Sequence, residues 1–492
     1  MIDNATALEL ARAAYSGSTT FFDANVRPDV ERNLRQFQSK HGNDSKYMSA
    51  SYRGRSNFYR PKTRSMVRSA EATAAEAFFS TADVVSISPQ EETDDAQKAS
   101  AEIMFELLQH RLTKSIPWYQ LLIGAYQDAM VQGVVISHQD WLLDERRKKD
   151  TPIIELIPRE NFRFDPAADW TDPVGTSPYL IRLIPMRVRD VKLRMKQGRW
   201  LRIDDATIKT ASQAWDSTRL QREGNRTDST NDVTTINDFS IVWVHLNIVA
   251  DEETGEDMLF YTLGTQYLLS SPVPLQERYA TGQRPFVMGK VVIETHRTDP
   301  TSKVALARDT QAEINEIANQ RIDNVKFAMN KRYFVKRNRQ VDIRSLTRNI
   351  PGGVTLLTDI ETDVKVVDTP DVTSSSYQEQ DRLNMDFDEI SGNMSQSSVQ
   401  ANRKLNETVG GMEILASDAN KVQAYDLKTF IETWVEPVLH QLVLLEQKYE
   451  TDKTILGLAA GKSQLFQKLG LDAVTDDLLE LDLTLRVNVC MT

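Results

Sequence analysis

Apolar residues recur at helical spacing in two long stretches of the chain, and each stretch predicts a helix. The first covers about residues 303–330, has no glycine or proline inside it, and carries only a thin apolar stripe. Its other faces hold amide side chains that an ordinary core helix would not need: Gln311, Asn315, Asn319, Gln320 and Asn324. The second covers about residues 412–449 and includes Pro437, which predicts a kink.

The first two thirds of the chain alternate between helical and extended patterns. Residues 91–132 predict two helices divided just before Pro117, and Gly133 closes the second one. A strand should follow directly in VVISHQDWLL, and further strands are expected at residues 153–157, 179–184, 241–249, 258–262 and 286–293. Residues 206–237 are rich in Thr, Ser, Asn and Asp and predict an exposed insertion, while residues 481–489 alternate at period two like a last strand. The fold class is α+β.

Length and composition limit the class of protein. With 492 residues the chain exceeds what one hydrophobic core usually organises, so two or more lobes are expected. No apolar run approaches the ~18–20 residues of a membrane span, and the first residues lack the layout of a signal peptide. The single cysteine, Cys490, excludes internal disulfides and cysteine-cluster metal sites.

Charge is distributed unevenly along the chain, whose net charge is −11. Residues 326–348 hold eight basic side chains against one acid, Asp342, for a local balance of +7; the basic residues are Lys326, Lys331, Arg332, Lys336, Arg337, Arg339, Arg344 and Arg348. Residues 359–389 hold ten acids against two basic residues, for a balance of −8. This reversal predicts a surface that meets polyanions or oppositely charged copies of the chain.

The first 60 residues are polar and predict an arm with short helices. Basic residues gather at its end beside Tyr52, Phe58 and Tyr59; they are Arg53, Arg55, Arg60, Lys62, Arg64 and Arg68. This cluster could contact DNA or a partner protein of a capsid. The plainer interpretation is a solvated arm that packs on a neighbouring subunit.

Six stretches, taken in order, resemble the portal protein of a tailed double-stranded DNA phage of the short-tailed type. Upstream are DAMVQGVVISHQDW and ELIPRENFRFDPAADW; then come PFVMGKVVIETHRTDP, the amide-bearing helix, NIPGGVTLLTDIETDVKVVDTPDV and SYQEQDRLNMDFDEISGN. The resemblance covers about residues 95–490. It rests on the order of these stretches, since none of them is a catalytic motif.

The resemblance implies a portal-type fold with an α/β wing, a long stem helix, a small α/β clip and a long C-terminal helix. The expected divisions are an N-terminal arm and start of the wing (1–90), the wing (91–300), the stem helix (301–330), the clip (331–372), a returning helix with a tunnel loop (373–411), and the long helix with a crown-side region (412–492). Such a protein is not an enzyme. It forms a ring-shaped DNA channel at one capsid vertex, through which the genome is packaged, retained and ejected.

The same resemblance implies partners and site residues. The partners are further copies of the chain, as a dodecamer, double-stranded DNA, terminase, tail adaptor proteins, and the major capsid and scaffolding proteins, with no membrane and no cofactor. The location is the virion, after assembly in the host cytoplasm. Arg403 and Lys404 would lie on the tunnel loop, and the basic patch of residues 326–348 would face DNA or pair with Asp359, Glu361 and Asp363 of an adjacent subunit.

Enzymatic alternatives find little support in the sequence. The stretch Gly457-Leu-Ala-Ala-Gly461-Lys-Ser has three residues between its glycines where a phosphate-binding loop needs four. The six histidines are scattered without paired metal-ligand spacing, so no metal site is expected. A different head or tail protein such as an adaptor, or a packaging enzyme, remains the alternative function.

Overall fold

The computed structural model describes most of the chain as two compact units. The described residues are 3–79, 85–89, 95–144, 149–210, 217–222, 240–329, 332–335, 342–347, 354, 359, 364–367, 373–392, 421–449 and 483–487. Unit 1 comprises Met1–Arg35, Val67–Ala305 and Val422–Thr492, and unit 2 comprises Gln36–Met66 and Leu306–Lys421. The chain is a mixture of helices and sheets, as the α+β prediction requires.

Unit 1 is built on an antiparallel sheet of six strands. The order along the sheet is β4 (Phe162–Phe164), β5 (Tyr179–Arg187), β6 (Ile241–Ala250), β7 (Asp257–Leu263) and β8 (Tyr267–Leu268), and β9 (Val273–Pro274) pairs with β7. Alternation puts neighbouring residues of β5 in different cores: Leu180 packs with β6 and β7, while Ile181 joins a cluster beneath the first helix. The predicted strands at 179–184, 241–249 and 258–262 are therefore confirmed.

A second antiparallel sheet of unit 1 has the order β10-β2-β3. Its strands are β10 (Phe286–Lys290), β2 (Val134–Asp144) and β3 (Lys149–Ile157). Strand β2 begins directly after α5 (Trp118–Gln132), where Gly133 adopts φ 92° and its N–H donates to the carbonyl of Ala129. Glycine at a helix C-terminus allows this left-handed turn, so the predicted helix-to-strand passage is confirmed.

Helices cover this second sheet and form the largest core of unit 1. They are α3 (Lys62–Phe79), α4 (Asp95–His110), the π-helix η4 (Arg111–Ser115), α5, the helical residues 421–430, the π-helix η6 (Ile431–Val435) and α17 (Glu436–Tyr449). Trp118 and Trp434 stack in its centre with 6.0 Å between ring centroids. The π-helical turn ends directly before Pro437, where the sequence predicted a kink. The last strand, β13 (Leu483–Val487), pairs with β1 (Val85–Pro89).

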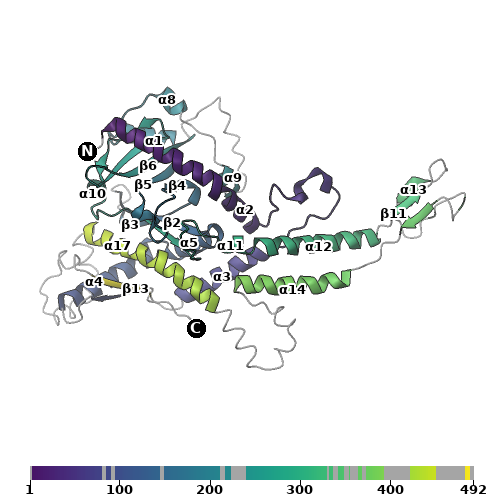
Figure 1. The fold of residues 1–492 in the computed structure, drawn as a ribbon. Helices are drawn as coiled ribbons and strands as arrows, with labels where there is room; N and C mark the ends of the chain where they lie inside the picture. The colour runs from purple at the N-terminus through teal and green to yellow at the C-terminus, as the bar shows by residue number, and fades with distance from the viewer. Residues whose placement is uncertain are drawn as a thin grey trace. The chain divides into compact units, whose positions relative to one another are not determined.

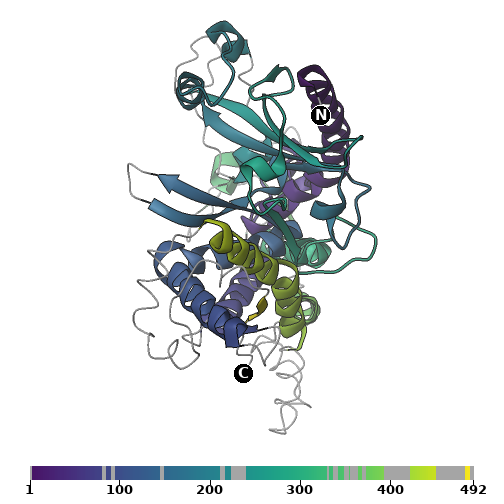
Figure 2. The same cartoon turned by 90° about the vertical axis from the view of Figure 1, so that its left-hand side faces the viewer.

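The N-terminal helices pack on unit 1 instead of extending into solvent as an arm. Helix α1 (Asn4–Phe21) crosses one face of the six-stranded sheet, as Figure 2 shows. The small side chains of Ala7 and Ala11 allow close approach to Val249 and Phe260. The chain continues through η1 (Phe22–Val26) into α2 (Arg27–Phe37), and the Phe22 ring is buried beneath three guanidinium groups, those of Arg27, Arg159 and Arg163.

The described part of the predicted exposed insertion is partly buried, so that prediction is wrong there. In α8 (Asp205–Thr210), Ile208 is buried beside α7 (Val188–Lys196). In α9 (Ser217–Arg222), Thr218 is buried, and Arg222 binds the buried carboxylate of Glu160 at 2.8 Å. The polar composition of this stretch predicted exposure, but polar side chains such as Thr218 and Arg222 can be buried or half-buried because they have hydrogen-bond partners in the folded chain. The remaining short elements of unit 1 are η5 (Arg159–Asn161), α6 (Pro173–Thr176), α10 (Leu275–Arg278) and α11 (Lys303–Leu306).

Unit 2 contains two long helices and a small β element. Helices α12 (Arg308–Met329) and α14 (Thr373–Ser391) lie side by side (Figure 1), and between them the chain forms β11 (Arg332–Val335), α13 (Ile343–Thr347) and β12 (Val364–Val367). Strands β11 and β12 pair in antiparallel fashion. The segment of residues 36–66 also belongs to this unit and contains η2 (Lys46–Met48) and η3 (Ala50–Tyr52). The sequence did not predict that this segment would join the later helices.

Strand β10 passes very close to the π-helix η6 at Gly289. A Cβ atom added there would lie 2.4 Å from Cβ of Trp434 and 3.1 Å from its Cα. Beside it, the Thr433 hydroxyl accepts from the Lys290 N–H at 3.0 Å and donates to the Lys290 carbonyl at 2.9 Å. The contact leaves no room for a side chain on β10.

We expect Gly289→Ala to lower the free energy of unfolding of unit 1 by about 1–3 kcal/mol, because the added methyl group overpacks the core. The matched control is Gly17→Ala on the exposed face of α1, where nothing lies within 4 Å of the added Cβ. The free energy of unfolding of that control should rise by up to ~1 kcal/mol, because alanine has a higher helix propensity than glycine. Urea denaturation followed by tryptophan fluorescence measures both. If the two variants unfold at the same urea concentration, β10 and η6 do not pack tightly at Gly289.

Candidate functional site

Three of the five amide side chains singled out on α12 bind the main chain of an extended segment. Asn319 accepts from the Phe58 N–H through Oδ1 and donates to the Phe58 carbonyl through Nδ2, both at 2.8 Å. Asn315 accepts from the Arg60 N–H at 2.8 Å, and Gln311 donates to the Arg60 carbonyl at 2.8 Å. These three side chains of α12 are almost fully buried. The segment that they hold, residues 56–63, is called the strap below.

Two further contacts complete the row at its ends. Asp323 accepts from the Ser56 N–H at 2.8 Å, and Gln311 accepts from the Thr63 N–H at 3.0 Å and from its hydroxyl at 3.1 Å. The amide of Gln36 donates to the same Thr63 hydroxyl at 2.9 Å. The row is thus Gln311, Asn315, Asn319 and Asp323, and it runs antiparallel to the strap.

The spacing of the row follows from the geometry of its two partners. Four residues of α-helix advance about 6.0 Å along the axis. Two residues of extended chain advance about 6.6 Å. A row at every fourth helix position therefore matches every second residue of the strap, as Asn319 with Phe58 and Asn315 with Arg60 show. Because the contacts at Ser56, Phe58 and Arg60 from the row are to main-chain groups, the row holds the strap mainly through its backbone.

Three members of the predicted basic patch are described, and they lie on three different elements. Lys326 lies at the end of α12, where its Nζ donates to the Ser56 hydroxyl at 2.7 Å, so it contacts the strap. Arg332 is in β11 opposite Val367, and Arg344 is the second residue of α13 and is exposed. Lys331, Lys336, Arg337, Arg339 and Arg348 lie outside the described residues, as do Glu361, Asp363, Arg403 and Lys404. Asp359 is described and is exposed.

The end of the α12–α14 pair carries exposed apolar side chains. Strand β11 runs through Tyr333 and Phe334, and the Phe334 ring is 60% exposed in the single chain. Its neighbours in unit 2 are similarly open: Phe327, Met329, Ile343, Val354 and Tyr377 are each more than half exposed. So many open apolar groups are typical of a surface that another protein covers.

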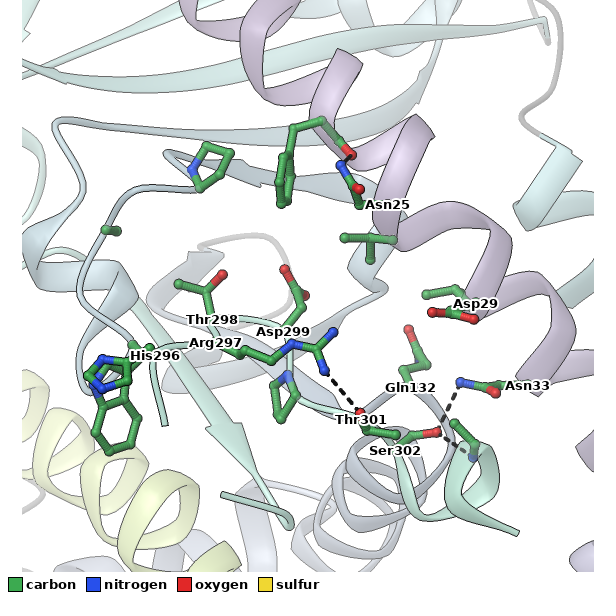
Figure 3. Close-up of a pocket in the computed structure, with 18 of the residues that line it drawn as sticks. Asn25, Asp29, Asn33, Gln132, His296, Arg297, Thr298, Asp299, Thr301 and Ser302 are labelled. Carbon is green, nitrogen blue, oxygen red and sulfur yellow. Dashed lines mark hydrogen bonds between the residues drawn. The ribbon is translucent and has the colours of Figure 1, made fainter. Parts of the chain in front are cut away.

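Unit 1 contains a cavity of about 430 Å³, which Figure 3 shows. Polar side chains from the N-terminal helices, among them Asn25 and Asn33, face a loop that includes Asp299. Two of the charged residues at its edge form ion pairs: Asp299 with Arg159 at 2.6 Å, and Arg297 with Glu294 at 2.8 Å. Asn33 donates to the Ser302 hydroxyl at 2.9 Å. These pairs hold the loop in place and leave no arrangement of nucleophile and base among the groups named.

The histidines do not assemble into a site. Burial and, second, the nearby charge of Arg163 lower the pKa of His245 to about 3, so the ring is neutral and stacks on Tyr15 with 4.8 Å between centroids. Burial also holds the pKa of His138 well below its usual range. Within the part of the chain that the structure describes, no group of three His, Cys, Asp or Glu side chains could hold a metal ion. Residues 457–463 and Cys490 lie outside that part.

Among the described helices, none is long and apolar enough to cross a bilayer.

Comparison with known proteins decides the family. The model of the phage SU10 portal protein family matches residues 7–152 and 140–473, which together span residues 7–473 without a gap. The chain belongs to this phage portal family. No curated protein sequence matches the chain.

The family assignment confirms the main functional predictions from the sequence. The chain is a phage portal protein, a structural component of the capsid vertex within an oligomeric assembly, and not an enzyme. The amide side chains on α12 of this portal protein stand out in the sequence, but their binding of the strap was not predicted. The recurrence of Gln311, Asn315, Asn319 and Asp323 at every fourth position was the available signal.

Proposed function

We propose that this portal protein forms a closed ring, a dodecamer, whose central channel carries double-stranded DNA during packaging, retention and ejection. The observation that carries the proposal is the helical pair α12–α14 with its small β element at the connecting end. This end exposes Phe327, Met329 and Phe334, which a single chain cannot bury. Neighbouring copies in a ring would cover such side chains through heterologous contacts.

Within this proposal, unit 1 without its N-terminal helices supplies the wing. Helix α12 is the stem helix and α14 the returning helix, and the β11–α13–β12 element is the clip, the docking end for terminase and later for tail adaptors. The basic side chains of the clip pair with Asp359, Glu361 and Asp363 of the adjacent subunit or face the DNA exit. Arg403 and Lys404 belong to the tunnel loop. The major capsid and scaffolding proteins would contact the wing.

Electron microscopy of the purified full chain tests the proposal, because a ring with a central opening is visible without any partner. We expect closed rings with twelve-fold symmetry. Analytical ultracentrifugation provides the quantitative counterpart. A species of roughly 56 kDa alone, at high protein concentration and in both low and high salt, would refute ring formation.

A further inference from the structure

Unit 2 carries two surfaces of opposite charge whose members are not paired with one another. The segment of residues 36–66, here called the basic segment, holds seven Lys and Arg residues against Asp44, a balance of +6. Helix α14 holds five acids against Arg382, a balance of −4. Each surface is therefore strongly charged within the same compact unit.

The two surfaces lie on different faces of α12. The strap binds the row from Gln311 to Asp323, whereas α14 contacts α12 through Arg321, whose guanidinium donates to Gln380 and lies 4.2 Å from the Tyr377 ring centroid. At about 100° per residue, Arg321 projects roughly 140° away from the middle of the row. Figure 1 shows the basic segment and α14 on opposite sides of α12. The two surfaces of one chain therefore cannot meet.

Several charged side chains on each surface are exposed. On the basic segment these are Arg53, Arg55 and Arg60. On α14 they are Glu379, Asp381, Asp386 and Glu389, since α14 turns Leu383 and Phe387 inward. Among the described residues, neither set forms an ion pair. Apolar side chains accompany both sets, with Met48 62% and Phe58 57% exposed on the basic segment and Tyr377 57% exposed on α14.

The basic segment is ordered independently of any partner. His41 stacks on Tyr47 with 4.2 Å between centroids, and the Tyr52 ring meets Tyr47 edge-on at 5.1 Å. Lys46 binds Glu316 of α12 at 2.6 Å, and the strap fixes the rest. Its exposed guanidinium groups are therefore presented from a preorganised surface, which lowers the entropic cost of docking.

We propose that the basic segment of one subunit docks on the exposed acidic face of α14 of a second copy of this chain. Every subunit offers one basic and one acidic surface on different sides of the same helix, so the contact is heterologous and repeats around a ring. This inference rests on the proposed ring and names the surfaces that join its subunits. Double-stranded DNA would also attract the basic segment, but it would leave the acidic face of α14 without a partner.

Charge reversal with compensation tests the contact in the full chain. The variant Arg53→Glu/Arg55→Glu/Arg60→Glu should lose rings at about 0.15 M salt, and Glu379→Lys/Asp381→Lys/Asp386→Lys should do the same. Combining all six substitutions should restore rings, because opposite charges again face each other. The matched control is Arg187→Glu/Arg189→Glu/Lys196→Glu, which applies the same charge change to exposed residues in and beside α7 and should leave rings intact.

The readouts are native mass spectrometry for the ring and fluorescence anisotropy with a 30-base-pair duplex for DNA. Intact rings in either triple variant would overturn the proposal, and so would a six-fold substituted variant that stays monomeric while remaining folded by circular dichroism. A triple variant of the basic segment that keeps its rings but loses affinity for the duplex would assign this surface to DNA. If the wild-type chain itself forms no ring, the proposed function fails first, and the two failures are thereby distinguished.

Discussion

Replacing Asn319 by alanine frees the middle of the strap from α12. The Asn319 side chain is fully buried and supplies both hydrogen bonds of Phe58, one to its N–H and one to its carbonyl. Alanine can make neither bond, and each lost partner of a buried polar group costs about 1–3 kcal/mol. Alanine also favours the helix more than asparagine does, so any loss of stability arises from the strap contact and not from the helix itself.

Hydrogen exchange at single-residue resolution measures this effect, since the strap is an opening unit of its own. We expect the Phe58 amide to exchange about thirtyfold faster in Asn319→Ala, which corresponds to about 2 kcal/mol. The matched control is Gln320→Ala, which removes an exposed amide from the adjacent position, where its Nε2 donates to Glu316 at 2.9 Å. Unchanged protection of Phe58 in Asn319→Ala, or equal loss in both variants, would show that the row does not hold the strap.

The sequence predicted most regular elements of unit 1 because their signals are local. The helix α5 before Gly133 and the strand β2 after it followed from periodicity and from turn chemistry. The predicted helix at 303–330 is also present, as α11 and α12. In each case the residues that decide the structure lie within a few positions of one another.

The contact between the strap and α12 could not be predicted because the two segments are about 250 residues apart in the chain. Thr63 and Gln311, for example, are separated by 248 positions, and no local pattern relates them. The amide side chains of α12 indicated an unusual partner, and the sequence reasoning assigned them to no contact within the chain. The basic residues near Phe58 were assigned to a solvated arm for the same reason. Hydrogen bonds to the main chain of the strap do not require particular side chains there. The strap sequence therefore carries no pattern that would reveal its partner.

A buried ion pair in unit 1 gives the second large effect. Arg111 Nε lies 2.9 Å from Glu446 Oε1, and Arg111 Nη2 lies 3.5 Å from Oε2. The side chain of Glu446 is 0% exposed and that of Arg111 is 6% exposed. The pair connects η4 to α17 across 335 positions of the chain, and the guanidinium also lies 5.6 Å from the Trp141 ring centroid.

We expect Glu446→Gln to lower the free energy of unfolding of unit 1 by about 3–5 kcal/mol, because it leaves the Arg111 charge buried without its counter-ion. The double variant Arg111→Met/Glu446→Leu removes both charges and keeps apolar volume in their place. It should recover most of that loss, since two desolvated charges contribute little net stability relative to well-packed apolar groups. Urea denaturation of the full chain, with tryptophan fluorescence as the probe, measures all three proteins.

An exposed pair in the preceding part of the same helical region serves as the matched control. Lys428 and Glu432 are 3.9 Å apart, and their side chains are 68% and 61% exposed. Glu432→Gln makes the same chemical change as Glu446→Gln, yet solvent screens the pair, so the loss should stay below about 1 kcal/mol. If the two glutamine variants unfold at the same urea concentration, the Arg111–Glu446 pair is not buried in the folded protein. If the double variant is as unstable as Glu446→Gln alone, the loss arises from packing around residue 446, because an unpaired charge no longer exists in that variant.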